Sequence, residues 1–147
     1  MVETIERDIF TVTRGIICHQ VNMKGVMGKG IALEIKNRFP NVFKAYRDAY
    51  EHGELHLGMV QFVTAGKELY VGNLVGQNRY GSGQRCTDYG ALRCAFQEVE
   101  KWSFGGLPVY IPYKIGCNNA GGDWATVKGI IELTIPQATI CKLPKEG

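Results

Sequence analysis

Hydrophobic and polar positions along the chain alternate between strand-like and helix-like patterns. In the helix-like segments, apolar residues recur every three or four positions, which is the spacing of one helix face. The strand-like segments are short runs rich in β-branched and aromatic residues. They cover residues 4–12, 15–18, 59–64, 69–74, 109–111 and 138–143. Strands and helices that alternate along a chain favour an α/β fold with a largely parallel sheet.

Four helices are expected from these spacings. The first covers residues 31–39, and Pro40 separates it from the second because proline suits only the first turn of a helix. The third follows a cap at Thr87 or Asp88, and the fourth follows a cap at Asp123. The apolar positions expected to face the core are Ile31, Ile35 and Phe39, then Phe43, Tyr46 and Tyr50, then Leu92, Phe96 and Val99, and finally Trp124, Val127, Ile130 and Ile131.

Two of the strand-like runs say more about the sheet. The runs at 59–64 and 69–74 flank a turn at Gly66, so they predict a hairpin that makes the sheet mixed. The run at 4–12 combines β-branched and charged residues, which is typical of an edge strand. The whole pattern predicts about six or seven strands.

The length of the chain fits one domain that covers residues 1–147. Hydrophobic residues make up 45% of it and charged residues 21%, a balance that excludes a disordered chain. No apolar run approaches the roughly 18 residues of a membrane span, and the N-terminus carries no apolar signal core. We therefore expect a soluble, cytoplasmic protein without membrane contact.

The charge and the metal-binding residue types narrow the function only slightly. A net charge of +3 with scattered basic residues does not indicate a nucleic-acid-binding protein. The five cysteines and three histidines show no spacing that is typical of a metal site. We expect reduced thiols and neither a metal nor another cofactor.

Glycine is more informative, because it fills 19 of the 147 positions and gathers in two segments. Residues 22–31, called the first loop below, lead from a buried strand into a helix. Glycine lets the backbone approach a ligand without an intervening Cβ atom, and a helix start adds N–H groups and a positive dipole end. This arrangement suits a phosphate. The spacing GxxGxG is neither a Walker A nor a dinucleotide motif, and a tight turn alone would also explain it.

Residues 115–123, called the second loop below, also run from a strand into a helix. Because the carboxyl ends of parallel strands meet at one edge of a sheet, the two loops would flank one crevice. A pyrophosphate with one loop on each side is the ligand that this arrangement favours.

Single polar residues near these segments each allow two interpretations. Asp8 can hydrogen-bond an adenine amino group or simply cap a turn. His19, at the end of a buried strand, can act in catalysis or be a buried structural group. Asp123 fits a helix cap without any catalytic role, and Tyr80 can belong to a mobile lid or to ordinary surface.

The segment VNMKGVMGKGIALEIKNRFP, together with IPYKIGCNNAGGDW near the C-terminus, resembles the macro domain family. The resemblance extends over nearly the whole chain and looks strongest toward small stand-alone domains of bacteria and phages that process ADP-ribose-1''-phosphate. It implies a three-layer α/β/α sandwich with a central mixed, largely parallel sheet. It also implies a cleft that binds ADP-ribose.

The resemblance further implies which residues contact ADP-ribose. Asp8 would hold adenine with support from Ile9, and Asn22 would contact the distal ribose. The first loop would surround the distal ribose and phosphate with Gly25, Val26, Met27, Gly28, Gly30 and Ile31. The second loop would close over the pyrophosphate with Ile115, Gly116, Cys117, Asn118, Asn119, Ala120, Gly121 and Gly122.

Two branches of the family fit the chain less well. The branch that removes ADP-ribose from protein carboxylates often shows NAAN and GGGGVDGAIH, where this chain has HQVN at 19–22 and its first loop. The branch that cleaves ADP-ribose from glutamate or DNA uses a lysine after a strand that corresponds to residues 73–77, and a carboxylate near Ala120. The present chain has neither group at these places.

The phosphatase branch fits better, because it places a histidine before the loop asparagine, as His19 precedes Asn22. Its usual Gly-Leu after the loop cysteine is replaced here by Asn118 and Asn119. The leading expectation is therefore hydrolysis of the terminal phosphate of ADP-ribose-1''-phosphate.

In this mechanism, amides of the first loop would stabilise the transferred phosphoryl group. The candidate catalytic residues are His19, Asn22 and Asp123, with His19 orienting water or protonating the leaving oxygen. Two alternatives stay open because one crevice serves all three functions. They are a glycohydrolase that removes ADP-ribose from protein or nucleic acid, and a non-catalytic ADP-ribose-binding module.

Overall fold

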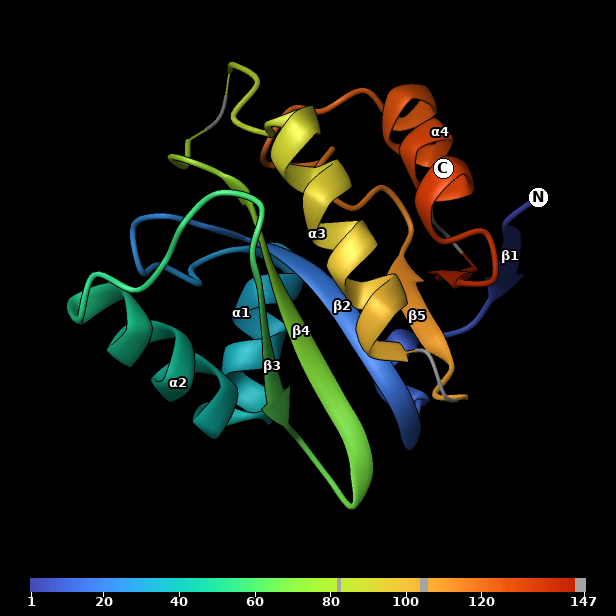
Figure 1. Cartoon of the computed structure of the whole chain (residues 1–147), viewed down its shortest axis with the longest axis horizontal. Helices are drawn as coiled ribbons and strands as arrows, with labels where there is room; N and C mark the ends of the chain where they lie inside the picture. Colours follow the sequence, from blue (N-terminus) through green and yellow to red (C-terminus); the bar gives the residue numbers. More distant parts are fainter. Residues whose placement is uncertain (82, 104–105, 145–147) are drawn as a thin grey trace.

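A computed structural model describes residues 1–81, 83–103 and 106–144 of the chain. Strands and helices alternate along most of these residues (Figure 1). In chain order the elements are β1 (Glu3–Glu6), the short 3-10 helix η1 (Ile9–Thr11), β2 (Arg14–Asn22), α1 (Gly30–Arg38), α2 (Pro40–Glu51), β3 (Val60–Thr64), β4 (Glu68–Gln77), α3 (Tyr89–Ser103), β5 (Val109–Pro112), α4 (Trp124–Thr134) and β6 (Thr139–Lys142).

The described strands form one six-stranded sheet in the order β1-β6-β5-β2-β4-β3. Every neighbouring pair is parallel except β3 and β4, which pair antiparallel through the turn that contains Gly66. In the centre of the sheet, Ile17 of β2 pairs with Val71 of β4 on one side and Tyr110 of β5 on the other. The predicted mixed, largely parallel sheet and its hairpin are confirmed.

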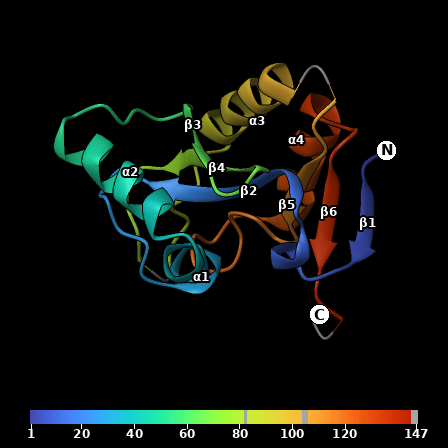
Figure 2. The ribbon, with the colours of Figure 1, turned by 90° about the horizontal axis from the view of Figure 1, so that it is seen from below.

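Helices cover both faces of this sheet (Figure 2). On one face, Phe96 of α3 and Ile131 of α4 pack against Ile16 of β2 and against strand residues of β4, β5 and β6. On the other face, Ile35 of α1 and Val42 of α2 pack with Ile17 of β2. Successive residues of a strand point to opposite faces, so Ile16 and Ile17 belong to different halves of the core. The three-layer α/β/α arrangement is confirmed.

The predicted edge strand at 4–12 is wrong in its second half. The strand β1 ends at Glu6, and residues Ile9–Thr11 form η1. Asp8 causes the change, because its Oδ1 atom accepts a hydrogen bond from the Phe10 N–H at 3.0 Å. A short polar side chain that hydrogen-bonds the next backbone groups competes with continued strand pairing.

Two central strands are longer than predicted. The strand β2 continues past Cys18 to Asn22, and β4 continues past Leu74 to Gln77. The added positions include polar residues, which an apolar pattern does not recognise as strand. Among them His19, Gln20 and Asn22 are buried, and each makes at least one hydrogen bond through its side chain.

The two predicted side-chain caps are present. The Ala91 N–H donates to Oδ1 of Asp88 at 2.9 Å, and the Thr126 N–H donates to Oδ2 of Asp123 at 3.0 Å. Among the helices of the described residues, none is both long and apolar enough to cross a lipid bilayer.

Candidate functional site

A cavity of about 760 Å³ lies at the carboxyl ends of the parallel strands. This volume falls within the range of small-molecule sites. Segments that follow five different strands line it, including both glycine loops. From the predicted ligand contacts, the lining residues are Asp8, Ile9, Asn22, Val26, Gly28, Gly30, Ile31, Ile115, Gly116, Cys117, Asn118, Asn119 and Ala120. The structure thus brings the two loops to one crevice, as their positions in the sequence predict.

Asn22 shapes the first loop from within. Its Nδ2 atom donates to the Val26 carbonyl at 2.9 Å, and its Oδ1 atom accepts from the Lys24 N–H at 2.8 Å. The Tyr46 hydroxyl donates to the same Oδ1 atom at 2.8 Å, and burial raises the pKa of Tyr46 to about 12, which keeps this donor protonated. Asn22 therefore lines the cavity mainly as the residue that holds the loop in shape.

The rear of the first loop rests on α2. Gly25 has φ of +74°, and a Cβ atom there would lie 2.6 Å from Cδ2 of Tyr50, so only glycine fits this turn. Met27 is 1% exposed and inserts into the core beside Tyr46. Neither Gly25 nor Met27 lines the cavity. Both residues were expected to contact the ligand. Gly25 instead supports the loop against α2, and Met27 anchors the loop in the core.

The first loop ends at the start of α1, which carries no side-chain cap. Lys29 holds the cap position with φ of −145° and ψ of 157°, and its side chain makes no capping hydrogen bond. The N–H groups in the first turn of a helix have no partners within the helix. Because Gly28, Lys29 and Gly30 all line the cavity, this end of α1 offers donors and a positive dipole end to an anion.

The second loop is folded on itself and fixed to the start of α3. The Gly122 N–H donates to the Gly116 carbonyl at 2.9 Å, and the Thr87 hydroxyl donates to the same oxygen at 2.6 Å. Gly121 has φ of +73°, and a Cβ atom there would lie 2.7 Å from the Gln84 carbonyl oxygen. Gly121 and Gly122 were expected to contact the ligand, but they do not line the cavity. Their role is to shape the loop on the side that faces away from it.

Cys117 lies in the second loop and lines the cavity. Burial raises the pKa of its thiol to about 11, with a further contribution from the negative charge of Asp123. The thiol is hence protonated at neutral pH, and its Sγ atom lies 3.4 Å from the Ile115 carbonyl. A thiolate nucleophile is not available here, since the thiolate is the reactive form of cysteine.

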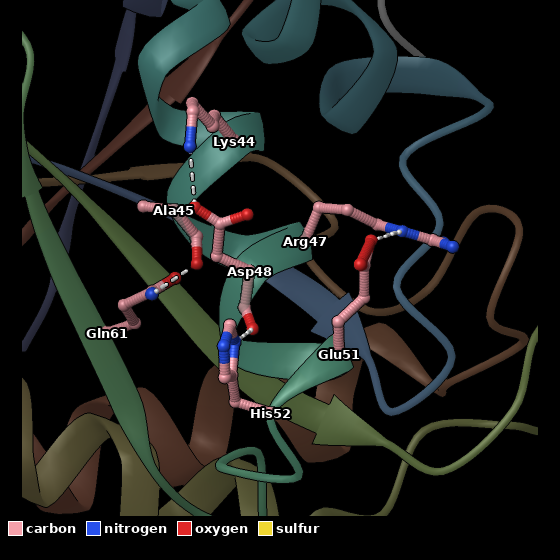
Figure 3. Close-up of polar contacts among 7 residues, drawn as sticks. All are labelled: Lys44, Ala45, Arg47, Asp48, Glu51, His52 and Gln61. Atoms are coloured by element: carbon pink, nitrogen blue, oxygen red, sulfur yellow. Dashed lines mark hydrogen bonds and ion pairs between the residues drawn. The ribbon is translucent and has the colours of Figure 1, made fainter.

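His19 lies away from the cavity. Its ring is fully buried and hydrogen-bonds through Nε2 to Oδ1 of Asn73 at 2.6 Å. Asn73 in turn donates to Gln61. Figure 3 shows the next bond of the chain, from Gln61 to the Ala45 carbonyl of α2. Since a carbonyl only accepts, this chain orients both amides and makes Nε2 of His19 the protonated nitrogen.

The environment of His19 does not support the expected catalytic role. Burial lowers its pKa to about 4, so the ring is neutral at physiological pH. The side chain is absent from the cavity lining, and its Nδ1 atom is buried without a hydrogen bond from any described residue. Strand alternation explains the placement, because His19 points to the α2 face while its neighbour Gln20 points to the α3 face.

Asp123 also differs from the expected catalytic placement. Its carboxylate caps α4, and the hydrogen bonds from the Thr126 hydroxyl and N–H lower its pKa. The residue is exposed and does not line the cavity. The structure therefore gives Asp123 the capping role.

Several polar or aromatic lining residues have no ligand contact assigned from sequence, and three of them lie near the ends of β2 and β4. They are Gln20 and Gln77, near the ends of β2 and β4, and Tyr80, which is 57% exposed. A polar residue at the carboxyl end of an otherwise buried strand is the signal that would have identified both glutamines. Among the described residues, no group of three His, Cys, Asp or Glu side chains is placed to hold a metal ion.

Comparison with known proteins supports this description. A sequence profile described as Macro domain matches residues 18–131. The DNA ADP-ribosyl glycohydrolase of Thermus aquaticus is 31% identical over 123 residues, covering 79% of this chain and 32% of that protein. The chain spans about a third or less of the length of the curated relatives it matches.

Solved structures show the same fold. A protein of unknown function from Bacteroides thetaiotaomicron superposes with a TM-score of 0.87 at 29% identity, over 97% of each chain. Thermosipho africanus DarTG in complex with ADP-ribose superposes with a TM-score of 0.80 at 20% identity, over 98% of this chain and 42% of that one.

Proposed function

Because this chain belongs to the macro domain family, we propose that its cavity binds ADP-ribose. The observation that carries the proposal is the placement of two glycine-rich loops on one cavity at the carboxyl edge of the sheet. The uncapped start of α1 offers backbone donors from one loop, and residues 115–120 face the same space from the other. Lys29 and Lys114 add positive charge to this lining, which favours a diphosphate.

The order of the strands gives the ligand a direction. Asp8 follows β1 at one end of the sheet, and Gln77 ends β4 near the other. A carboxylate such as Asp8 accepts from the amino group of adenine, so the base belongs at the β1 end. The diphosphate then lies between the loops, and the distal ribose lies over β2 and β4.

The activity that we propose is hydrolysis of the phosphate of ADP-ribose-1''-phosphate. Phosphoryl transfer depends mainly on positioning and on electrostatic stabilisation of the equatorial oxygens. Backbone N–H groups of the first loop and the start of α1 are suited to both tasks. The leaving oxygen is that of a hemiacetal, which is more acidic than an ordinary alcohol and depends less on an acid catalyst. The reaction thus does not require His19, which lies outside the cavity.

A second candidate is removal of ADP-ribose from DNA or protein, supported by the similarity to the Thermus aquaticus DNA ADP-ribosyl glycohydrolase. The residue at the end of β4 is the neutral Gln77, and Ala120 stands near the place of a carboxylate, so the chain lacks the lysine and the acid that the resemblance associates with that branch. The phosphatase therefore remains the first candidate, and a binding module without activity is the third.

One set of assays separates these candidates. Calorimetry with ADP-ribose tests binding, and absence of heat with wild-type protein would refute the whole proposal. Product analysis then follows three substrates: ADP-ribose-1''-phosphate, ADP-ribosylated DNA and ADP-ribosylated protein. Release of inorganic phosphate from ADP-ribose-1''-phosphate supports the phosphatase, release of ADP-ribose from DNA or protein supports the glycohydrolase, and tight binding without product supports the binding module.

A further inference from the structure

Gln20 has a buried polar atom with no partner at the edge of the cavity. The residue lies in β2, is 9% exposed and lines the cavity together with Gln77 and Gly116. Its Oε1 atom is buried and receives no hydrogen bond from any described residue. Buried acceptors in proteins nearly always have a donor, so one supplied by a ligand or solvent is expected here.

The hydrogen bonds around Gln20 determine which of its amide atoms is the oxygen. The Gln77 amide donates through Nε2 to the Arg79 carbonyl at 2.7 Å, which directs its own Oε1 atom toward Gln20. The Thr87 hydroxyl donates to the Gly116 carbonyl at 2.6 Å, which leaves its oxygen to accept from Gln20.

Gln20 accordingly donates through Nε2 to Gln77 at 2.8 Å and to Thr87 at 2.9 Å. A flipped amide would place its oxygen against the Gln77 oxygen and would lose both bonds. Two backbone carbonyls, those of Arg79 and Gly116, therefore fix Oε1 of Gln20 as the unpartnered atom.

None of the described side chains donates a hydrogen bond to this oxygen. It lies beside Gly76 of β4, and a Cβ atom on Gly116 of the second loop would be 3.0 Å from it. Glycine at both positions keeps the space around the oxygen free of side chains. The oxygen itself has almost no exposed surface, so a donor reaches it after a small shift of the Gln20 side chain or of the second loop.

The position of Gln20 along the sheet indicates which part of a ligand reaches it. Its neighbours Gln77 and Gly116 belong to the end of β4 and to the second loop, whereas Asp8 lies at the β1 end. With the base at Asp8 and the diphosphate between the loops, the distal ribose is the part nearest to Gln20. The ribose carries hydroxyl donors, while a phosphate dianion carries only acceptors.

We propose that Oε1 of Gln20 accepts a hydrogen bond from a hydroxyl group of the distal ribose and so determines which ligands the β4 end of the cavity takes. The inference rests on the proposed binding of ADP-ribose and adds a residue that recognises its distal ribose. A ligand with a donor at this place is favoured, and one with only acceptors there is disfavoured, because two facing acceptors repel each other.

The test compares Gln20→Met with the wild-type protein by calorimetry. Methionine keeps the length of glutamine and removes its polar atoms. We expect affinity for ADP-ribose to fall at least fivefold, while affinity for ADP, which lacks the distal ribose, changes less than twofold. Gln61→Met is the matched control: Gln61 does not line the cavity, so neither affinity should change.

Ligand analogues identify the donor. With wild-type protein, either 2''-deoxy- or 3''-deoxy-ADP-ribose should bind at least fivefold more weakly than ADP-ribose, and Gln20→Met should not discriminate against that analogue. Equal loss of ADP and ADP-ribose affinity in Gln20→Met, or no loss of either, would overturn the inference. Equal binding of both analogues and ADP-ribose by wild-type protein would also overturn it, by indicating water as the donor.

Folding and binding failures are separable. Thermal unfolding shows whether Gln20→Met folds, and if it does not, the comparison of the two deoxy analogues with ADP-ribose on the wild-type protein decides alone. An unchanged affinity for both analogues then contradicts the inference. Wild-type protein that binds no ADP-ribose refutes the proposed function and the inference together, whereas normal wild-type binding with an unaffected Gln20→Met refutes the inference alone.

Discussion

Gly30 at the start of α1 lies against the side chain of Asn119 of the second loop, and both residues line the cavity. A Cβ atom on Gly30 would lie 3.2 Å from Nδ2 of Asn119, which is tighter than an ordinary contact. The two glycine loops therefore approach each other so closely at this point that a side chain on Gly30 would crowd Asn119. Gly30 also has φ of +57°, a conformation that other residues adopt only with strain.

Gly30→Ala is expected to weaken ADP-ribose binding about tenfold, which corresponds to ~1.4 kcal/mol. The added methyl group strains the backbone and pushes Asn119 from the cavity edge. Calorimetry of the variant measures the loss. Gly129→Ala in α4 is the control, because a Cβ atom there meets nothing within 4 Å, so binding should not change. Wild-type affinity in Gly30→Ala would show that the approach of the two loops is unimportant for the ligand.

Asp8→Asn tests the direction of the bound ligand. Asparagine retains the cap on η1, where Asp8 accepts from the Phe10 N–H, but replaces the second carboxylate oxygen with an amide donor. Affinity for ADP-ribose should fall about 10-fold or more, as expected for loss of a charged acceptor.

The matching ligand carries hypoxanthine in place of adenine, which presents an oxygen where adenine has its amino group. Asp8→Asn should bind this ligand better than the wild-type protein does. An equal loss for both ligands would mean that Asp8 contributes by capping or charge, without contacting the base.

His19 is expected to make the protein less stable in weak acid. Burial lowers the pKa of its ring from 6.5 to about 4 in the folded protein. Between these values the unfolded chain binds a proton that the folded protein does not, so the free energy of unfolding falls as pH decreases from 6.5 to 4. The full effect is about 3 kcal/mol, reached below the lower pKa.

Urea unfolding at pH 7 and pH 4.5 measures this loss of stability. His19→Gln removes the titrating ring, and the difference between wild type and variant isolates it from the carboxylates. A pH dependence that is the same in both proteins would contradict the assignment of a neutral, buried His19.

Asp123 is expected to affect stability without affecting the ligand. Asp123→Ala removes the cap of α4 and should lower the melting temperature by about 3 °C, while Asp123→Asn should retain most of the stability. Phosphate release from ADP-ribose-1''-phosphate should be unchanged in both variants. Loss of turnover in Asp123→Asn, with stability intact, would restore a catalytic role for this carboxylate.

The sequence alone was sufficient for features that depend on local chemistry. Proline at position 40 separates two helices, Asp88 and Asp123 cap the next ones, and alternating apolar segments build a parallel sheet. The two glycine loops are also predictable from local sequence, because glycine between a strand and a helix already implies a tight turn at the carboxyl edge of the sheet. Their meeting in one cavity follows from the parallel topology.

The tertiary structure decided what each polar side chain does. His19 and Gln20 are neighbours in β2, yet the ring of His19 is buried and bonded to Asn73, whereas the side chain of Gln20 reaches the cavity. Which face of the sheet becomes a site depends on loops that arrive from distant parts of the chain. Met27 and Gly121 illustrate the same point, since their positions resemble ligand contacts while packing from α2 and from residues 84–85 gives them supporting roles. Burial and hydrogen-bond partners come from the assembled layers, and they determine the chemistry of a side chain more than its neighbours in sequence do.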